Sequence, residues 1–175
     1  MSRIEAGDRM VVSFVEPVET RTFRADDWPY HVALLPWYRI DDRQLGNWQT
    51  QLRRIADTSE AFETEVGEED YFGKRHNILG RRLAQSAFRS LHYRLFNAVS
   101  CEKNGVGGDF ASPNEVGKGY DPYIAQRFSQ LLEEGQVIRI ASLSEIVKID
   151  AGLGEYDLEV VSQHQLKQGK GETAA

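Results

Sequence analysis

Short strand-like segments alternate with two amphipathic helices along this chain, and their order constrains its fold more than any other feature. The first helix is predicted to begin after the acidic pair Asp41-Asp42, because aspartate is a favoured cap of helix N-termini. The apolar residues that follow recur three, four and three positions apart, as one face of a helix requires. They are Leu45, Trp48, Leu52 and Ile55. A second apolar stripe between Phe88 and Val99 predicts a second helix.

The remaining apolar segments have the β-branched or alternating composition of strands. They cover approximately residues 10–15, 30–35, 62–66, 78–83, 120–127, 137–149 and 156–160. The last two are predicted to form a hairpin across the glycine-containing link 151–154. We also expect a short helical turn around Leu131-Leu132, a long loop over 101–119 and a disordered tail over 169–175.

The formal net charge of −6 argues against a protein that coats nucleic acids, because such proteins neutralise phosphates with a broad basic surface. The charge does not exclude a small local basic site, because several arginines are clustered in the central third of the chain. A solvated helix face and turn is nevertheless the favoured interpretation of that cluster. Its members are Arg53, Arg54, Arg75, Arg81, Arg82, Arg89 and Arg94.

The single cysteine, Cys101, cannot form an internal disulfide. The N-terminal residues contain no apolar run of signal-peptide or membrane-spanning length. We therefore predict a cytoplasmic protein with no membrane partner. A length of 175 residues suits one domain with a sizeable core, predicted over residues 1–168.

Two short motifs on predicted strands carry the candidate chemistry. The first contains His31 and Ala33, and the second contains Tyr123, Ala125 and Arg127. Residues two positions apart on a strand point to the same face, so each motif presents its members together. The apolar residues between them are expected to pack inward. The two faces are predicted to converge on one ligand.

In order and spacing, these motifs resemble the paired His-x-Thr-x motifs of the 2H phosphoesterase superfamily, which includes the 2′-5′ RNA ligases and cyclic phosphodiesterases. Residues 30–37 look like the first motif, and residues 120–125, with their proline, look like the second. The resemblance extends over nearly the whole chain. It implies an α+β, two-lobed fold of antiparallel sheets flanked by helices, with a central cleft. It also implies a metal-independent reaction without a cofactor, in which two histidines transfer protons and two threonines hold the phosphate.

The sequence departs from this pattern at three of the four motif positions. Ala33 and Ala125 replace the threonines and remove two hydrogen-bond donors. Tyr123 replaces the second histidine, and a phenol with a pKa of about 10 is a poor base at neutral pH. His31 and Tyr123 are therefore the predicted catalytic pair. Arg127, together with the positions of Ala33 and Ala125, is predicted to hold the phosphate.

The aromatic residues near the first motif allow two interpretations. Trp28 and Trp37 would stack a nucleotide base, or they would be ordinary core and rim residues, which is at least as favoured. Among the other histidines, His92 is expected to be a partly buried, hydrogen-bonded residue, and His76 and His164 are expected at the surface. No spacing typical of a metal site occurs, so we predict none.

Three functional hypotheses follow from these residues. The first is a degenerate 2H protein that binds a nucleotide or an RNA-end phosphate with weak or no catalysis. The second is a working phosphodiesterase of 2′,3′-cyclic or 2′-5′ phosphodiesters that uses His31 and Tyr123. The third is a scaffold whose cleft has no ligand.

Overall fold

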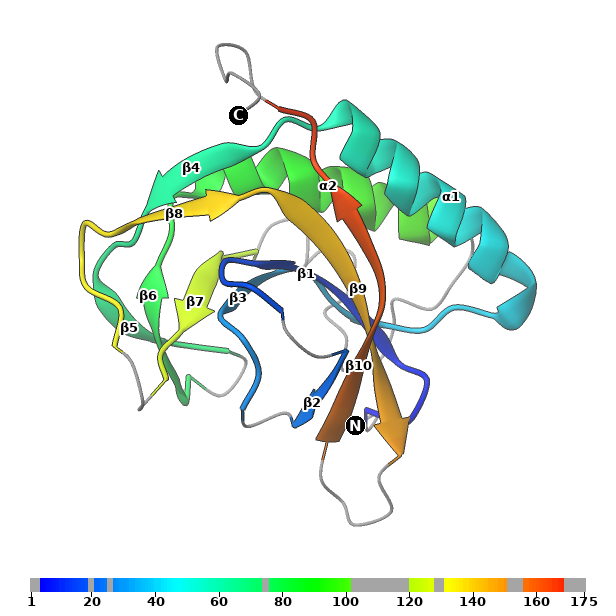
Figure 1. Ribbon diagram of the computed structural model, residues 1–175, viewed down its shortest axis with the longest axis horizontal. Coiled ribbons are helices and arrows are strands. Elements are labelled where there is room, and N and C mark those ends of the chain that lie inside the picture. Colours follow the sequence, from blue (N-terminus) through cyan, green and yellow to red (C-terminus); the bar gives the residue numbers. More distant parts are fainter. Residues whose placement is uncertain are drawn as a thin grey trace.

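The computed structural model describes residues 4–18, 21–24, 27–73, 76–101, 120–127, 131–150 and 156–168. Its elements (Figure 1) are, in order, β1 (Arg9–Phe14), β2 (Thr22–Arg24), β3 (His31–Tyr38), α1 (Asp42–Thr58), β4 (Phe62–Glu65), β5 (Glu69–Phe72), β6 (Ile78–Arg82), α2 (Gln85–Cys101), β7 (Tyr123–Ala125), β8 (Val137–Ile140), β9 (Ser142–Asp150) and β10 (Tyr156–Gln165). The predicted loop beyond residue 101, the hairpin link and the tail lie outside the described residues.

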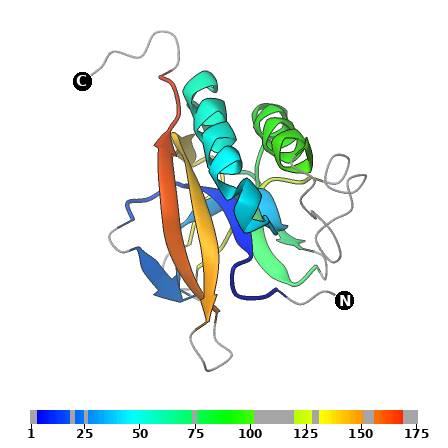
Figure 2. The ribbon, with the colours of Figure 1, turned by 90° about the vertical axis from the view of Figure 1, so that its right-hand side faces the viewer.

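In the part of the chain that the structure describes, eight strands form one antiparallel sheet in the order β2-β10-β9-β1-β3-β7-β6-β5, and β4 and β8 form a separate pair. The two helices pack against each other, and they contact β3, β9 and β10. Figure 2 shows them side by side on one side of the strands. The predicted α+β class is therefore confirmed. In the described part of the chain, no helix is long and apolar enough to cross a membrane.

The sheet has an apolar cluster on each face. On β1, Val11 belongs to the cluster under the helices, whereas its neighbours Met10 and Val12 belong to the other. The helix-side cluster includes Trp48 and Leu52 of α1 and Phe88 and Leu95 of α2. The second cluster consists of Met10, Val12, Phe14, Ile146, Leu158 and Val160. This alternation assigns every second residue of the central strands to the face away from the helices.

Both helices form where their apolar stripes predict them. Asp41 caps α1 by accepting a hydrogen bond from the backbone N–H of Arg43 at 3.0 Å. Trp48 is fully buried on the stripe, and its Nε1–H donates to the carboxylate of Glu145 on β9 at 2.6 Å. Glu145 is also fully buried and accepts from Tyr38 and Arg9, each at 2.7 Å. This network joins α1 to β1, β3 and β9 through satisfied polar groups.

Two strands of the sheet, β2 and β5, were not predicted from the sequence. β2 has three residues, which is too short to display a period of two. β5 carries Glu69 and Asp70 in an acidic stretch that resembles a loop. It forms a strand because its residues pair with β6, from Glu69 opposite Arg81 to Phe72 opposite Ile78. The strand ends at Phe72, and the turn that follows it begins at Gly73, whose φ is +86°.

The second half of the chain differs from the predictions in four further places, one of which is β10, which extends to Gln165 rather than Val160. The predicted strand over 137–149 divides at Ala141, because β8 pairs with β4 while β9 pairs with β1 and β10. β7 covers only Tyr123–Ala125 rather than residues 120–127. The expected helical turn at Leu131-Leu132 is wrong. The Gln126 side chain accepts from the backbone N–H of Leu132 at 2.9 Å and donates to its carbonyl at 3.0 Å, so it holds this segment in another conformation.

Candidate functional site

The two motifs lie on adjacent strands of the large sheet. β3 pairs with β7 through Val32 opposite Ile124, and both of these side chains are fully buried in the helix-side cluster. Directly opposite residues of an antiparallel pair point to the same face, and their neighbours point to the other. The remaining motif residues of both strands therefore share the face away from the helices.

Counting outward from that pair, His31 lies opposite Ala125, and Ala33 lies opposite Tyr123. His31 and Tyr123 are consequently diagonal neighbours, a relation that places side chains about 7–8 Å apart and within reach of aromatic rings. All four residues are partly exposed. A small ligand on this face would contact both motifs at once.

Tyr120 fixes the start of the second motif against the first. Its hydroxyl donates to the carbonyl of Ala33 at 2.9 Å, and its ring stacks on that of His92 at 4.0 Å and 4°. His92 is buried, and its Nδ1–H donates to the carbonyl of Leu34 at 2.7 Å. The prediction of a hydrogen-bonded His92 is therefore confirmed, although His92 is fully rather than partly buried. Through these contacts α2 holds β7 in register with β3.

The imidazole of His31 lies in an aromatic environment. The ring of Trp28 approaches it with centroids 3.4 Å apart, and Phe14 makes an edge contact at 6.2 Å. This burial lowers the pKa of His31 to about 4, against the opposing effect of its hydrogen bond to Pro29. Because Nδ1–H donates to the Pro29 carbonyl at 2.8 Å, the lone pair of the neutral ring is on Nε2. His31 is thus a neutral acceptor at pH 7.

Tyr123 lies flat on a second aromatic ring. It stacks on Phe72 of β5 with centroids 4.5 Å apart and an interplanar angle of 7°. The backbone of Gly80 makes room for both rings, since a Cβ there would lie 3.2 Å from each and 2.8 Å from the Ile124 carbonyl oxygen. Burial raises the pKa of Tyr123. The phenol is therefore protonated at neutral pH and acts as a hydrogen-bond donor.

Arg127 lies near the first motif but is engaged by acidic groups. Its guanidinium forms an ion pair with Glu16 at 2.5 Å and a longer one with Asp27 at 3.7 Å. It also lies over the ring of Tyr30, 5.0 Å from its centroid. A phosphate would have to share or displace these partners, so the predicted role of Arg127 stays a prediction.

The two candidate stacking residues have different surroundings. Trp28 covers His31 and stacks on Phe23 with centroids 6.0 Å apart, so it belongs to the same face as the motifs. Trp37 is partly buried and packs against both apolar clusters, as an ordinary core and rim residue does. Trp28 therefore lies on the motif face beside His31, and the stacking of a base on either tryptophan stays a prediction.

Arg82 is a further cation on this face, which sequence reasoning assigned to a solvated surface. It lies opposite Tyr123 in the β6–β7 pairing, and its guanidinium carbon lies 5.1 Å from the centroid of Phe72. The alternation of Ile78, Gly80 and Arg82 along β6 would have grouped these residues on one face. The pairing of β6 with β7, however, is a tertiary feature that no local pattern reveals.

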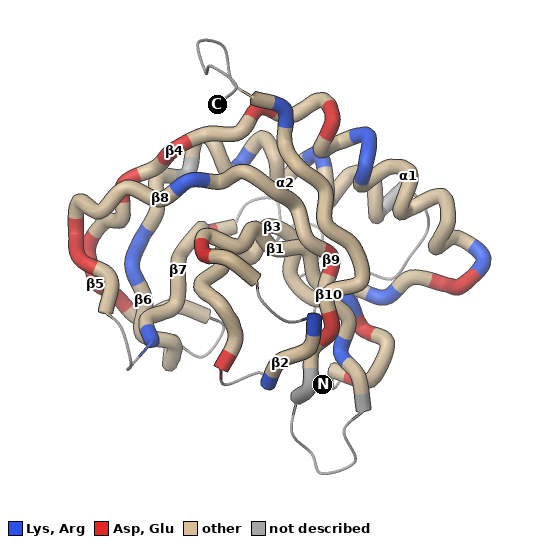
Figure 3. Tube along the Cα trace, viewed as in Figure 1, with Lys and Arg blue, Asp and Glu red and all other residues tan. Residues whose placement is uncertain are grey.

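Acidic side chains surround both arginines. Arg82 forms ion pairs with Asp121 and Asp70, each at 2.8 Å, and with Glu68 at 3.7 Å. In Figure 3 acidic positions on β5 lie near basic positions on β6. Among the described residues no three histidine, cysteine, aspartate or glutamate side chains group closely enough to hold a metal ion. Anion binding here would therefore rely on arginines whose charge is already partly compensated.

Known proteins resemble this chain in structure rather than in sequence. No protein-family model and no curated protein matches it. The crystal structure of TT0787 from Thermus thermophilus aligns with a TM-score of 0.63 at 14% identity, covering 92% of this chain and 98% of that one. A phosphoesterase aligns with a TM-score of 0.64 at 10% identity, covering 94% and 100%. E. coli LigT complexed with 3′-AMP aligns with a TM-score of 0.61 at 10% identity, also covering 94% and 100%.

These alignments cover nearly all of both chains, so they concern the whole fold rather than a shared fragment. At identities of 10 to 14% they establish the fold alone. The order of elements and the two strand motifs had pointed to the same architecture. The chain therefore has the fold of the 2H phosphoesterases, as its sequence predicted.

Proposed function

We propose that this chain binds a nucleotide or an RNA-end phosphate on the sheet face that carries His31 and Tyr123, with weak or no catalysis. The observation that carries the proposal is the β3–β7 register, which groups both motifs on one face beside Trp28. E. coli LigT, which shares the fold, has been crystallised with 3′-AMP, ATP, NADP+ and phosphate. The same face of this chain offers donors and an aromatic ring to a ligand of that kind.

The contacts of the proposed ligand follow from the protonation states. The Tyr123 hydroxyl is a donor to a phosphoryl oxygen, since its raised pKa keeps the proton in place. The neutral His31 accepts a hydrogen bond at Nε2 from a ribose hydroxyl. Ala33 and Ala125 offer methyl groups where threonines would donate, so fewer hydrogen bonds hold the phosphate. Affinity in the millimolar range, about −4 kcal/mol, fits this reduced set.

A second candidate function is phosphodiester cleavage, favoured by the lone pair on Nε2 of His31. In that reaction Nε2 takes the proton of the attacking hydroxyl, and the Tyr123 hydroxyl gives its proton to the leaving oxygen. A base with a pKa of about 4 and an acid with a raised pKa are both poorly matched to neutral pH. These shifts oppose efficient turnover, and for this reason we favour binding over catalysis.

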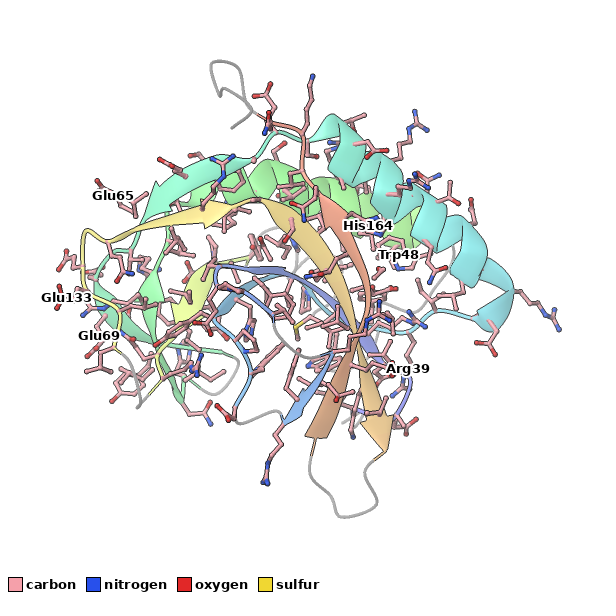
Figure 4. The ribbon with its side chains drawn as sticks, in the orientation of Figure 1. Arg39, Trp48, Glu65, Glu69, Glu133 and His164 are labelled. Carbon is pink, nitrogen blue, oxygen red and sulfur yellow. The ribbon has the colours of Figure 1, made fainter. Side chains whose placement is uncertain are left out.

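Isothermal titration with inorganic phosphate and with 3′-AMP tests the proposal, together with an assay of 2′,3′-cyclic nucleotide hydrolysis. Wild type should bind 3′-AMP more tightly than phosphate, and His31→Ala and Trp28→Ala should each weaken 3′-AMP binding about tenfold. His164→Gln is the matched control, because His164 lies on β10 opposite the buried Leu143, on the helix side of the sheet (Figure 4). Equal binding by His31→Ala and wild type would refute the proposed site. Fast hydrolysis that depends on His31 would favour the second function.

A further inference from the structure

We propose that Arg82 is a second anion-binding residue of this face and that Asp121 and Asp70 occupy its guanidinium until a ligand phosphate displaces them. The inference rests on the proposed function, because it assigns a further contact and a built-in competitor to the same ligand. In this proposal Asp121 and Asp70 belong to the binding site, because they compete with the ligand for Arg82.

The strand register and two contacts of Phe72 place Arg82 on the same face as the predicted catalytic tyrosine. Arg82 lies directly opposite Tyr123 across the β6–β7 pair. Its guanidinium carbon lies 5.1 Å from the centroid of Phe72, and Phe72 stacks on Tyr123. Cross-strand partners share a face, so Arg82 points to the same side as Tyr123. A phosphate that accepts a hydrogen bond from the Tyr123 hydroxyl would therefore lie within reach of this guanidinium.

The hydrogen bonds of Arg82 are those that a phosphate would replace. Nη1 donates to the two carboxylate oxygens of Asp121 at 3.0 and 2.8 Å, and Nη2 donates to Asp70 at 2.8 Å. The side chains of Arg82 and Asp121 are each 37% exposed, and that of Asp70 is 50% exposed. Ion pairs this accessible to water are weak, so an incoming anion can exchange with them. Phosphate and carboxylate bind the planar guanidinium in the same bidentate manner.

The neighbouring arginines differ from Arg82 in their partners. Arg81 points to the opposite face, and its guanidinium donates to the backbone carbonyls of Leu132 and Gly67 at 3.2 and 3.4 Å. The nearer of the two acidic partners of Arg127, Glu16, is itself anchored by the backbone N–H of Tyr30 at 2.8 Å. The ion-pair partners of Arg82 in the described part of the chain are exposed carboxylate side chains, so it is the arginine best placed to change partners.

The negative charge around Arg82 is expected to weaken phosphate binding. One guanidinium faces three carboxylates, those of Glu68, Asp70 and Asp121, which leaves a formal excess of two negative charges. An approaching phosphate meets both this repulsion and competition for the donors. Removing the charge of Asp121 while retaining its shape should therefore strengthen phosphate binding.

The test is isothermal titration of inorganic phosphate and 3′-AMP at low ionic strength with wild type, Asp121→Asn, Arg82→Gln and the double variant. We expect Asp121→Asn to tighten binding of both probes by about three- to tenfold and Arg82→Gln to weaken it by about tenfold. Glu69→Gln is the matched control, because it removes the same charge from β5 while Glu69 lies opposite Arg81 on the other face (Figure 4). It should change binding less than twofold.

The double variant separates competition from simple charge repulsion. If Asp121 competes for the donors of Arg82, most of the gain from Asp121→Asn disappears once Arg82 is glutamine. A gain that persists undiminished in the Arg82→Gln background, or an equal gain from Glu69→Gln, overturns the inference. Wild-type binding that Asp121→Asn leaves unchanged overturns it while the proposed function stands. Absence of binding by every variant, with thermal unfolding showing folded protein, overturns both.

Discussion

The two faces of the central strands differ in burial and in polar contacts, although alternate residues of the same strands form both faces. On the helix side, Val32 and Ile124 are fully buried, and the buried carboxylate of Glu145 has its hydrogen bonds satisfied by Tyr38, Trp48 and Arg9. On the other side, residues of the candidate site are partly exposed, and Arg82 has exposed partners. We infer that the helix side specifies the fold, while the motif side, which carries His31 and Tyr123, is the face available to the proposed ligand.

The largest effect should come from breaking the helix side. Glu145→Ala leaves a largely buried arginine, Arg9, without its partner and removes the acceptor of Trp48, so the free energy of unfolding should fall by about 3–5 kcal/mol. Urea denaturation measures this change. Glu63→Ala, at an exposed position of β4, should alter stability by less than about 0.5 kcal/mol. Similar effects of the two substitutions would contradict the central role of the network.

A glycine on the motif side, Gly80, tests how tightly the site is packed. Gly80→Ala places a methyl group against the Ile124 carbonyl and the two stacked rings, so it should cost about 1–3 kcal/mol. The matched control is Gly46→Ala in α1, where a Cβ has nothing within 4 Å. That substitution should stabilise the protein by up to about 1 kcal/mol. If Gly80→Ala were equally stabilising, Tyr123 and Phe72 would not be packed over the strand as described.

His31 provides a pH test of the motif side. Its pKa is about 4 in the folded chain and near 6.5 when unfolded, so the unfolded state binds more protons between these values. Stability should therefore be complete above pH 6.5 and should fall as the pH drops towards 4. Allowing for the partial exposure of the ring, the loss is about 1–2 kcal/mol. His31→Gln should flatten this part of the profile, and an unchanged profile would contradict the described burial.

The smallest effect on stability is expected at the Tyr123 hydroxyl. Tyr123→Phe keeps the stacking on Phe72 and removes only the donor, so the free energy of unfolding should change by less than about 0.5 kcal/mol. Tyr123→Ala also loses the ring contact, worth about 0.5–1.5 kcal/mol beyond the buried area. Thermal unfolding compares the two variants. Binding of 3′-AMP should weaken in both, and full affinity in Tyr123→Phe would exclude the hydroxyl from the site.

The sequence predicted the parts of the fold that have a strong local period. The acidic cap and the stripe through Trp48 predicted α1 and its start, and the alternation around Phe62 predicted β4 to within one residue. β2 and β5 were missed because one is too short to show a period and the other is acidic and gains its strand conformation from pairing with β6. The division of β8 from β9 was missed because it depends on which partners each strand finds.

The candidate site was predicted only in part, because some of its residues come together only through tertiary pairing. The period of two correctly indicated that His31 and Tyr123 leave the helix side, and the β3–β7 pairing brings them to one face. The carboxylates that pair with Arg82 and Arg127 come from other segments of the chain, so no local sequence pattern predicts these ion pairs. His164 was expected at the surface but is partly buried, and its Nε2 atom is fully covered, on a strand, β10, that contacts α1.

Mapping amide chemical shifts during titration with 3′-AMP would locate the ligand on one face or the other. We predict that the perturbed amides cluster on the motif side, at His31, Tyr123 and Arg82, while the indole N–H of Trp48 under the helices stays unchanged. Perturbations confined to the helices or to the outer surface of β4 and β8, or none at millimolar 3′-AMP, would contradict a binding site on this face.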